Sequence, residues 1–131
     1  MAYPETWLRA AIEDATGCRT FPVQAAEAAA TPFVVYQRTG TERERSTMAN
    51  PGVPVATFSI VVYADTYTGA KELAERVRLA VDDFQGEEGG VRIERATLTD
   101  EADGDVVDFA GEGKPTYSVV LTFEVRFREG V

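Results

Sequence analysis

The segment from Tyr117 to Arg128 constrains the fold more strongly than any other part of this chain. Apolar or aromatic side chains occupy every second position, and most of the positions between them are polar. The alternating apolar set is Tyr117, Val119, Leu121, Phe123, Val125 and Phe127. Because successive side chains of a β-strand point to opposite faces, this pattern predicts a strand with one buried and one solvated face. A slip of one residue would exchange the two faces, so the sequence specifies the register strongly.

Residue patterns upstream predict two helices and three more strands. Trp7, Leu8, Ala11 and Ile12 recur at helical spacing, and Gly17 supplies a stop. The strand segments are rich in β-branched and aromatic residues, whereas the second helix has one apolar face. The predicted elements are a helix over about 4–15, strands over 33–39 and 55–64, a second helix from beyond Thr66 to about Phe84, and a strand of weaker pattern over 91–98.

This order of helix, strand, strand, helix, strand, strand favours an α+β fold. Its simplest packing is a mostly antiparallel sheet of about four strands with both helices on one face. A chain of 131 residues is of the usual size for one domain, so we expect residues 1–131 to form a single domain. The second face of the sheet still carries Val61, Tyr63 and Val120, which indicates either half-exposed sheet surface or a contact with a neighbouring subunit.

Three connecting segments have less definite patterns. The stretch 24–30 is rich in alanine and fits either a short helix or a loop. The stretch 40–54 is long and turn-rich for a link between paired strands, which indicates a protruding arm. The stretch 100–115 is acidic and rich in glycine, and we expect a solvated loop there, with a short strand over 106–109 as an option.

The arm and the strand before it contain the only concentrated positive stretch of the chain. Arginines alternate there with glutamates, so the local net charge is modest. One interpretation is a solvated arm; the other is a contact between subunits, because guanidinium groups pair well with carboxylates of an acidic neighbour. The candidate interface residues are Arg38, Glu42, Arg43, Glu44, Arg45 and Tyr63.

Composition argues against an enzyme and against a metal or cofactor site. The chain contains no histidine, which removes the commonest general base and the commonest transition-metal ligand. Cys18 is the only cysteine and is best explained as a small, partly buried thiol. The stretch 111–116 superficially resembles a phosphate-binding loop, but Asp108 stands where that motif needs a glycine. Calcium binding over 99–110 would need carboxylates where Thr99 and Ala110 stand.

The net charge of −9 would repel nucleic-acid phosphates at long range. Sequence-specific binding to DNA or RNA is therefore disfavoured. No run of apolar residues approaches the length of a membrane span, so we expect a soluble protein made in the cytoplasm and no membrane partner.

Several of these segments together resemble the tail terminator family, also called tail completion or minor tail proteins, of long-tailed bacteriophages, prophages and gene transfer agents. In that family a helix precedes a strand of proline, aromatic and valine residues, and a later strand ending in Tyr-Ala-Asp runs directly into a helix. Here Val62-Tyr-Ala-Asp65-Thr-Tyr67 fits this junction. The matching segments are 7–12, 31–36, 58–84 and 118–127.

The resemblance implies a structural role in the virion without catalytic residues. It implies a homo-oligomeric ring, commonly of six subunits, that caps the tail tube at its head-proximal end, stops polymerisation and presents a surface to the head connector. Its expected partners are the major tail tube protein and the connector protein, and DNA would pass through without sequence-specific binding. An acidic lumen is compatible with such passage.

Ring closure requires two different patches on each subunit. We expect the 40–54 arm and a free sheet edge to form one, and the outer side of the first helix to contribute to the other. The alternatives are a head-tail joining protein, a tail tube subunit, or a small cytosolic ligand-binding domain with a pocket between helices and sheet.

Overall fold

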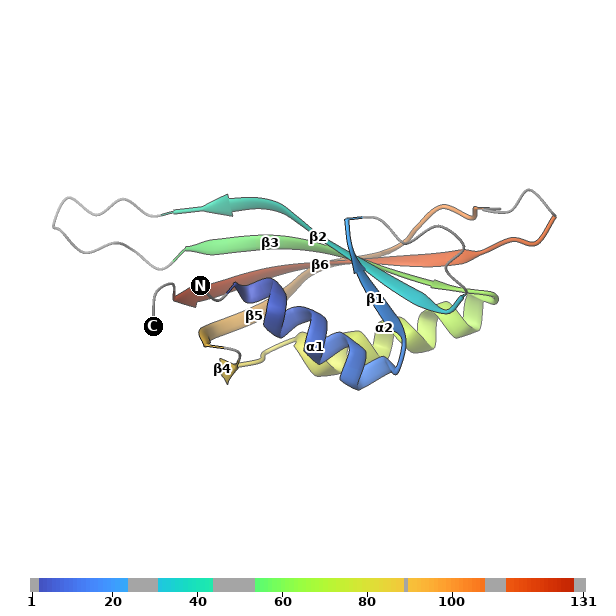
Figure 1. Cartoon of the computed structure of the whole chain (residues 1–131). Helices are drawn as coiled ribbons and strands as arrows, with labels where there is room; N and C mark the ends of the chain where they lie inside the picture. The colour runs from blue at the N-terminus through green and yellow to red at the C-terminus, as the bar shows by residue number, and fades with distance from the viewer. Residues whose placement is uncertain (1–2, 24–30, 44–53, 89, 108–112, 129–131) are drawn as a thin grey trace, which may run out of the picture.

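The computed structural model describes residues 3–23, 31–43, 54–88, 90–107 and 113–128, which form two helices and one six-stranded sheet. In chain order the elements are α1 (Pro4–Thr16), β1 (Arg19–Pro22), β2 (Phe33–Glu42), β3 (Val55–Ala64), α2 (Tyr67–Val81), β4 (Gly86–Glu88), β5 (Val91–Asp103) and β6 (Tyr117–Arg128). The sheet order is β1-β2-β3-β6-β5-β4, and only the β1–β2 pair is parallel. Figure 1 shows both helices on the same side of this long, curved sheet.

The core lies between the helices and the sheet face that they cover, which we call the inner face. β3 and β6 pair at the centre of the sheet, with Phe58 directly opposite Phe123. Every second side chain of β6 from Val119 to Phe127 is buried against the helices. The mixed α+β fold, the two helices on one face and the alternating C-terminal strand are therefore confirmed.

The helix ends follow the local sequence. Gly17 has a left-handed backbone with φ of 69°, and its N–H donates to Glu13 O at 2.8 Å, which closes α1. The Thr66 side chain accepts from the Gly69 N–H and caps α2. α2 ends at Val81, so the predicted end near Phe84 is wrong. Asp82 leaves the helical conformation and its Oδ1 accepts from Leu98 N–H at 2.9 Å, which ties the chain to β5.

The predicted sheet of about four strands is also wrong, because β1 and β4 are additional strands. Both lie at the edges of the sheet and are only three or four residues long, so no alternating pattern marks them. β2 continues to Glu42, beyond the predicted end at Thr39. β5 runs to Asp103, so the first part of the expected acidic loop is strand.

Three of the sequence predictions fall partly or wholly on residues outside the described ranges. The alternatives for 24–30 and the 44–53 part of the predicted arm lie there. Of the optional strand over 106–109, the described part contains an isolated bridge between Val107 and Thr116.

Close packing at the base of the β5–β6 connection gives a testable prediction. Gly104 N–H donates to Ser118 O at 3.0 Å, and the Ser118 hydroxyl donates to Asp105 O at 2.9 Å. A Cβ added at Gly104 would overlap Ser118 Oγ and press on Val120. We expect Gly104→Ala to lower the free energy of unfolding by about 1–3 kcal/mol, measured by urea denaturation.

The matched control for this substitution is Gly40→Ala. A Cβ at Gly40 would meet no atom within 4 Å, and its backbone requires no positive φ. This variant should match the parent protein or be slightly more stable. Equal denaturation midpoints for the two alanine variants would contradict the packing described at Gly104.

Candidate functional site on the outer face of the sheet

The face of the sheet that points away from the helices, here called the outer face, has no helix over it among the described residues (Figure 1). Strand register arranges its side chains in rows that run across β2, β3, β6 and β5. The first row is Phe33, Tyr63 and Ser118, and the second is Val35, Val61, Val120 and Ala102. The next rows are Gln37, Ser59, Thr122 and Asp100, then Gly40, Thr57, Glu124 and Thr97. The last are Glu42, Val55, Arg126 and Arg95, followed by Arg128 and Arg92. The outer face thus changes from apolar to charged along the strands.

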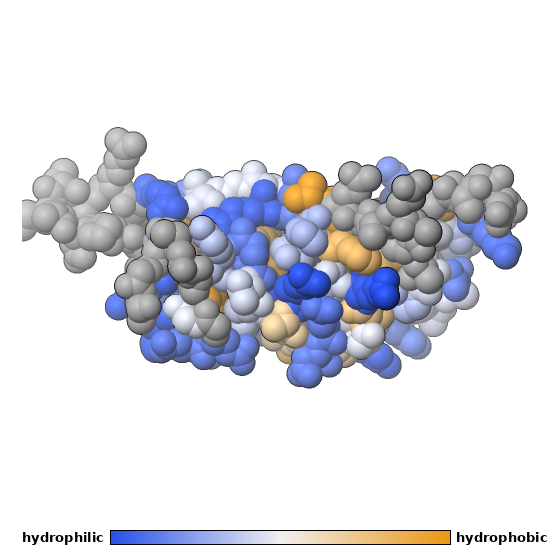
Figure 2. All heavy atoms as spheres, viewed as in Figure 1, coloured by the Kyte–Doolittle hydropathy of each residue, from blue (hydrophilic) through white to orange (hydrophobic). Residues whose placement is uncertain are grey.

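The apolar half of the outer face is built on aromatic packing. The Phe33 and Tyr63 rings stack with centroids 4.8 Å apart, and the Phe21 ring meets Phe33 edge-on at 6.2 Å. Burial raises the pKa of the Tyr63 hydroxyl above its ordinary value. Beyond this cluster the three valines of the second row are only half-buried. Figure 2 shows hydrophobic residues gathered near β1, where Val23 is 65% exposed.

The charged half of the outer face contains a hollow that is open to solvent. Arginines and glutamates line it together with threonines. Its lining residues are Glu42, Val55, Thr57, Arg95, Thr97, Glu124 and Arg126. Mixed charge of this kind suits a contact with another protein surface better than a small neutral ligand.

The sequence-predicted interface residues do not all lie on this face. Glu42 is exposed and lines the hollow, and Tyr63 lies in the aromatic cluster. Arg43 is exposed directly after β2. Glu44 and Arg45 lie outside the described residues. Arg38 points to the inner face instead, because it alternates in regular register with the buried residues Val34 and Tyr36 and lies opposite Phe58.

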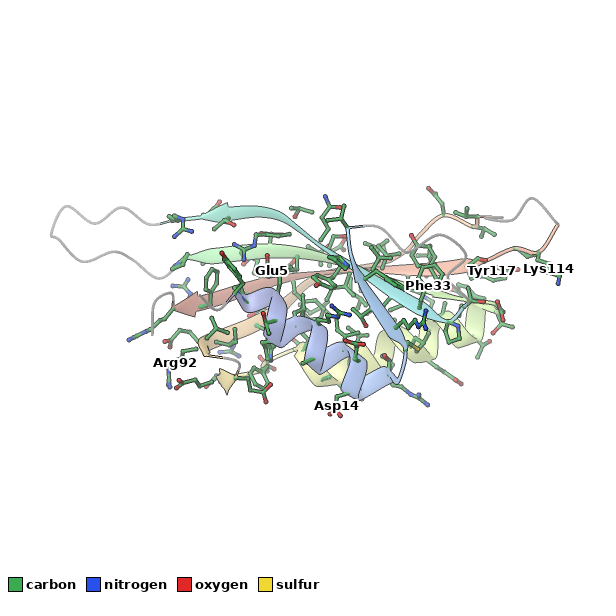
Figure 3. The ribbon with its side chains drawn as sticks, viewed as in Figure 1. Glu5, Asp14, Phe33, Arg92, Lys114 and Tyr117 are labelled. Carbon is green, nitrogen blue, oxygen red and sulfur yellow. The ribbon has the colours of Figure 1, made fainter. Side chains whose placement is uncertain are left out.

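Arg38 joins β2 to α1 within the subunit. Its guanidinium lies 5.5 Å from the ring centroids of Phe58 and Phe127 and pairs with the carboxylate of Glu5, labelled in Figure 3. It also donates to Thr41 Oγ1 at 3.2 Å. The planar cation therefore covers one end of the core, a position that the charge pattern alone could not reveal.

We expect Arg38→Ala to lower the free energy of unfolding by about 1–2 kcal/mol, because it removes two cation–π contacts and a partly exposed ion pair. Arg38→Lys should recover only part of this loss, since an ammonium cannot lie flat between two rings. Thermal and urea denaturation measure both variants. An alanine variant as stable as the parent would show that the guanidinium contributes nothing to the core.

A second hollow lies between α1 and the end of α2. The Trp7 and Phe84 rings line it with centroids 5.0 Å apart and planes tilted by 32°. The Trp7 indole N–H is buried without a hydrogen-bond partner among the described residues. Four alanines and two carboxylates complete the lining: Ala10, Ala11, Ala15, Ala80, Asp14 and Glu88. Neither hollow gathers polar groups around an apolar cavity, which a ligand-binding domain would need.

Within the described ranges, no three histidine, cysteine or acidic residues are grouped so that they could hold a metal ion. Neither described helix is long and apolar enough to cross a membrane. Cys18 is free and half-buried, as the sequence predicted, and its Sγ contacts Thr16 O at 3.6 Å.

At the far end of β5, Lys71 and the Tyr67 hydroxyl of α2 both donate to the carboxylate of Asp103. These bonds hold the pKa of Asp103 below its ordinary value, and the bond from Lys71 has the larger effect. A depressed carboxylate pKa favours folding above the unfolded pKa, and this contribution disappears as the pH falls through the folded pKa. We expect Lys71→Ala to raise the Asp103 pKa, measured by NMR titration of its side-chain carbon. An unchanged titration curve would contradict the Lys71 contact.

Comparisons with known proteins assign the chain to a class. The model of a family described as "Tail completion protein gp17" matches residues 7–128. The chain is therefore a structural protein of a phage-type tail. Within that class it belongs to the tail completion protein gp17 family, which confirms the family resemblance of the sequence.

Among solved structures, the fold is similar to that of a chain in the virion of a native gene transfer agent particle. The two superpose with a TM-score of 0.64 and 16% identity, over 88% of this chain and 83% of that chain. At this identity the likeness establishes the shared fold. No curated protein sequence matches significantly.

Proposed function

We propose that this chain forms a ring, of six subunits as the family resemblance implies, at the head-proximal end of the tail tube. The ring ends polymerisation of the tube and joins it to the head connector. The observation that carries the proposal is the family match across residues 7–128. The major tail tube protein and the connector protein are the proposed partners, and the chain is proposed to act in the virion without catalysis.

The outer face supports this assembly role. Its half-buried valines and its charged rows are arranged across four strands of the sheet. A sheet face of this kind gains stability when a second surface covers its apolar part. Glu42, Arg43 and Tyr63 remain proposed members of a subunit contact, whereas the guanidinium of Arg38 is engaged inside the subunit.

The charge of the chain supports passage of DNA through the ring. A lumen lined by subunits that each carry a net charge of −9 repels the phosphates of DNA, so DNA is not retained there. We therefore propose that DNA crosses the ring without sequence-specific binding.

Electron microscopy of particles from cells that lack this chain tests the proposal. A tube terminator predicts tubes of uncontrolled, excessive length. Tubes of normal length without heads would instead indicate a head-tail joining protein, and absence of tubes would indicate a tube subunit. Normal, intact particles would contradict every tail role and would favour a cytosolic ligand-binding domain. Re-expression of the parent chain is the control.

A further inference from the structure

Arginines and carboxylates of the β5–β6 pair gather at different positions along the strands. Arginines lie where β5 begins and β6 ends, and carboxylates lie where β5 ends. The first group, here called the arginine end, is Arg92, Arg95, Arg126 and Arg128. The second, here called the acidic end, is Asp100, Glu101, Asp103 and Asp105. In Figure 3, Arg92 lies at one end of the molecule and Lys114, from the opposite end of the β5–β6 pair, lies at the other.

The arginine end brings like charges together. Strand register places Arg92 directly opposite Arg128 and Arg95 directly opposite Arg126. Like charges opposite each other across a strand pair destabilise the pairing. A sheet that keeps two such pairs adjacent therefore needs carboxylates close by, either its own or those of another molecule.

The subunit's own carboxylates satisfy three of these four arginines. Glu94 Oε1 lies 2.6 Å from Arg128 Nε and 3.4 Å from Arg92 Nε, and Asp83 Oδ1 lies 2.8 Å from Arg95. Arg126 is exposed and has no ion pair with any described residue. Its guanidinium faces the hollow of the outer face and can bind a carboxylate from outside.

The acidic end contains carboxylates that have no cation beside them among the described residues. Asp103 is paired with Lys71, and Glu101 lies on the helix side near Arg78. Asp100 belongs to the outer face, because it pairs with Thr122, and Asp105 follows the strand. Both are exposed, and their carboxylates have no hydrogen bond or ion pair with any described residue.

We propose that the acidic end of one copy docks on the arginine end of the next, with Asp100 and Asp105 as partners of Arg126. Asp105 lies beyond Asp103, the last residue of β5, whereas Asp100 is opposite Thr122, about 13 Å along β6 from Arg126. Neither carboxylate pairs with Arg126 within one subunit, so we expect them to meet it between copies. Such head-to-tail contacts generate closed rings when the rotation between subunits closes. This inference rests on the proposed function and names the contact by which its ring would form.

A protein partner fits the arginine end better than a nucleic acid does. Glu42, Glu94 and Glu124 lie among the four arginines, so the local excess of positive charge is small. A phosphate backbone laid across this surface would meet these three carboxylates as well as the four arginines. Individual aspartates of a second copy can reach a guanidinium without that repulsion.

Charge exchange tests the proposal. Arg126→Glu alone, and Asp100→Arg with Asp105→Arg, should each weaken self-association by about tenfold or more, because each places like charges in the contact. The chain that carries all three substitutions should regain the parent's association. Sedimentation velocity over a concentration series, at about 50 and 500 mM salt, measures the association. Particle counts after complementation of cells that lack the chain give a second readout. Circular dichroism must show that every variant is folded.

Several results would overturn the proposal. One is a triple variant that folds yet associates and complements no better than the single-end variants. Another is a parent chain that shows no salt-dependent association while either variant complements normally. If Arg126→Glu abolishes complementation but the aspartate variant does not, the arginine end binds a different partner, such as a tube protein or DNA. The proposed function is tested independently by the particles of cells that lack the chain. That experiment uses no charge variant, so the docking proposal can fail while the proposed function holds.

Discussion

Leu121→Asp is expected to give a chain that does not fold. Leu121 is fully buried at the centre of β6, where its side chain faces the helices and its backbone pairs with Ile60. An aspartate there would have to bury an unpaired charge or become protonated, and either costs several kcal/mol, which is comparable with the total stability of a domain of this size. Circular dichroism and one-dimensional NMR of the purified variant measure the loss of structure.

Val120→Asp provides the matched control, because it introduces the same side chain one residue away. Val120 belongs to the second row of the outer face, where the side chain is only half-buried. This variant should fold. If the outer face takes part in assembly, it should also complement cells that lack the chain less well than the parent. A folded Leu121→Asp variant would mean that the two faces of β6 have been assigned in reverse.

Phe123→Ala is expected to lower the free energy of unfolding by about 3–5 kcal/mol, because it removes a large buried ring and leaves a cavity. Phe123 is fully buried, and its strand neighbours are Phe58 on β3 and Leu98 on β5. The ring therefore fills the middle of the core, and the surrounding strands cannot close over the space. Urea denaturation followed by fluorescence of Trp7 measures the change.

The comparison variant for this truncation is Thr122→Ala on the outer face. Thr122 is half-buried in a polar row between Ser59 and Asp100, so its loss should change stability by less than about 1 kcal/mol. If the two alanine variants had similar denaturation midpoints, Phe123 would not be a central core residue.

Sequence periodicity predicted the central strands well, because burial on one face leaves a strict pattern. The predicted bounds of β3 and β6 agree with the structure at both ends. The edge strands β1 and β4 left no such pattern, since most of their residues are exposed or half-buried. The end of α2 depended on a tertiary contact, the bond from Leu98 N–H to Asp82, which a local pattern cannot reveal.

The candidate site was harder to predict than the central strands, because it depends on which residues of neighbouring strands lie opposite each other. Tyr63 and Glu42 were singled out and lie on the outer face. Arg38 lies on the same face of β2 as Val34 and Tyr36, so its side chain points toward Phe58 and the core. The opposition of Arg95 and Arg126 depends on the register shift between Leu98 and Asp100, so spacing along the chain could not show it.

The position of β6 at the centre of the sheet affects how the protein is made. Ala64 and Tyr117 are paired neighbours although they lie about fifty residues apart along the chain. Until the ribosome has released β6, the long edge of β3 and its row of buried side chains have no partner strand. An uncovered edge of this kind invites aggregation, and closing such a distant pair slows folding. Cells that overproduce the chain should therefore accumulate aggregates chiefly from incomplete products, and slower translation should not help the central strands to pair earlier.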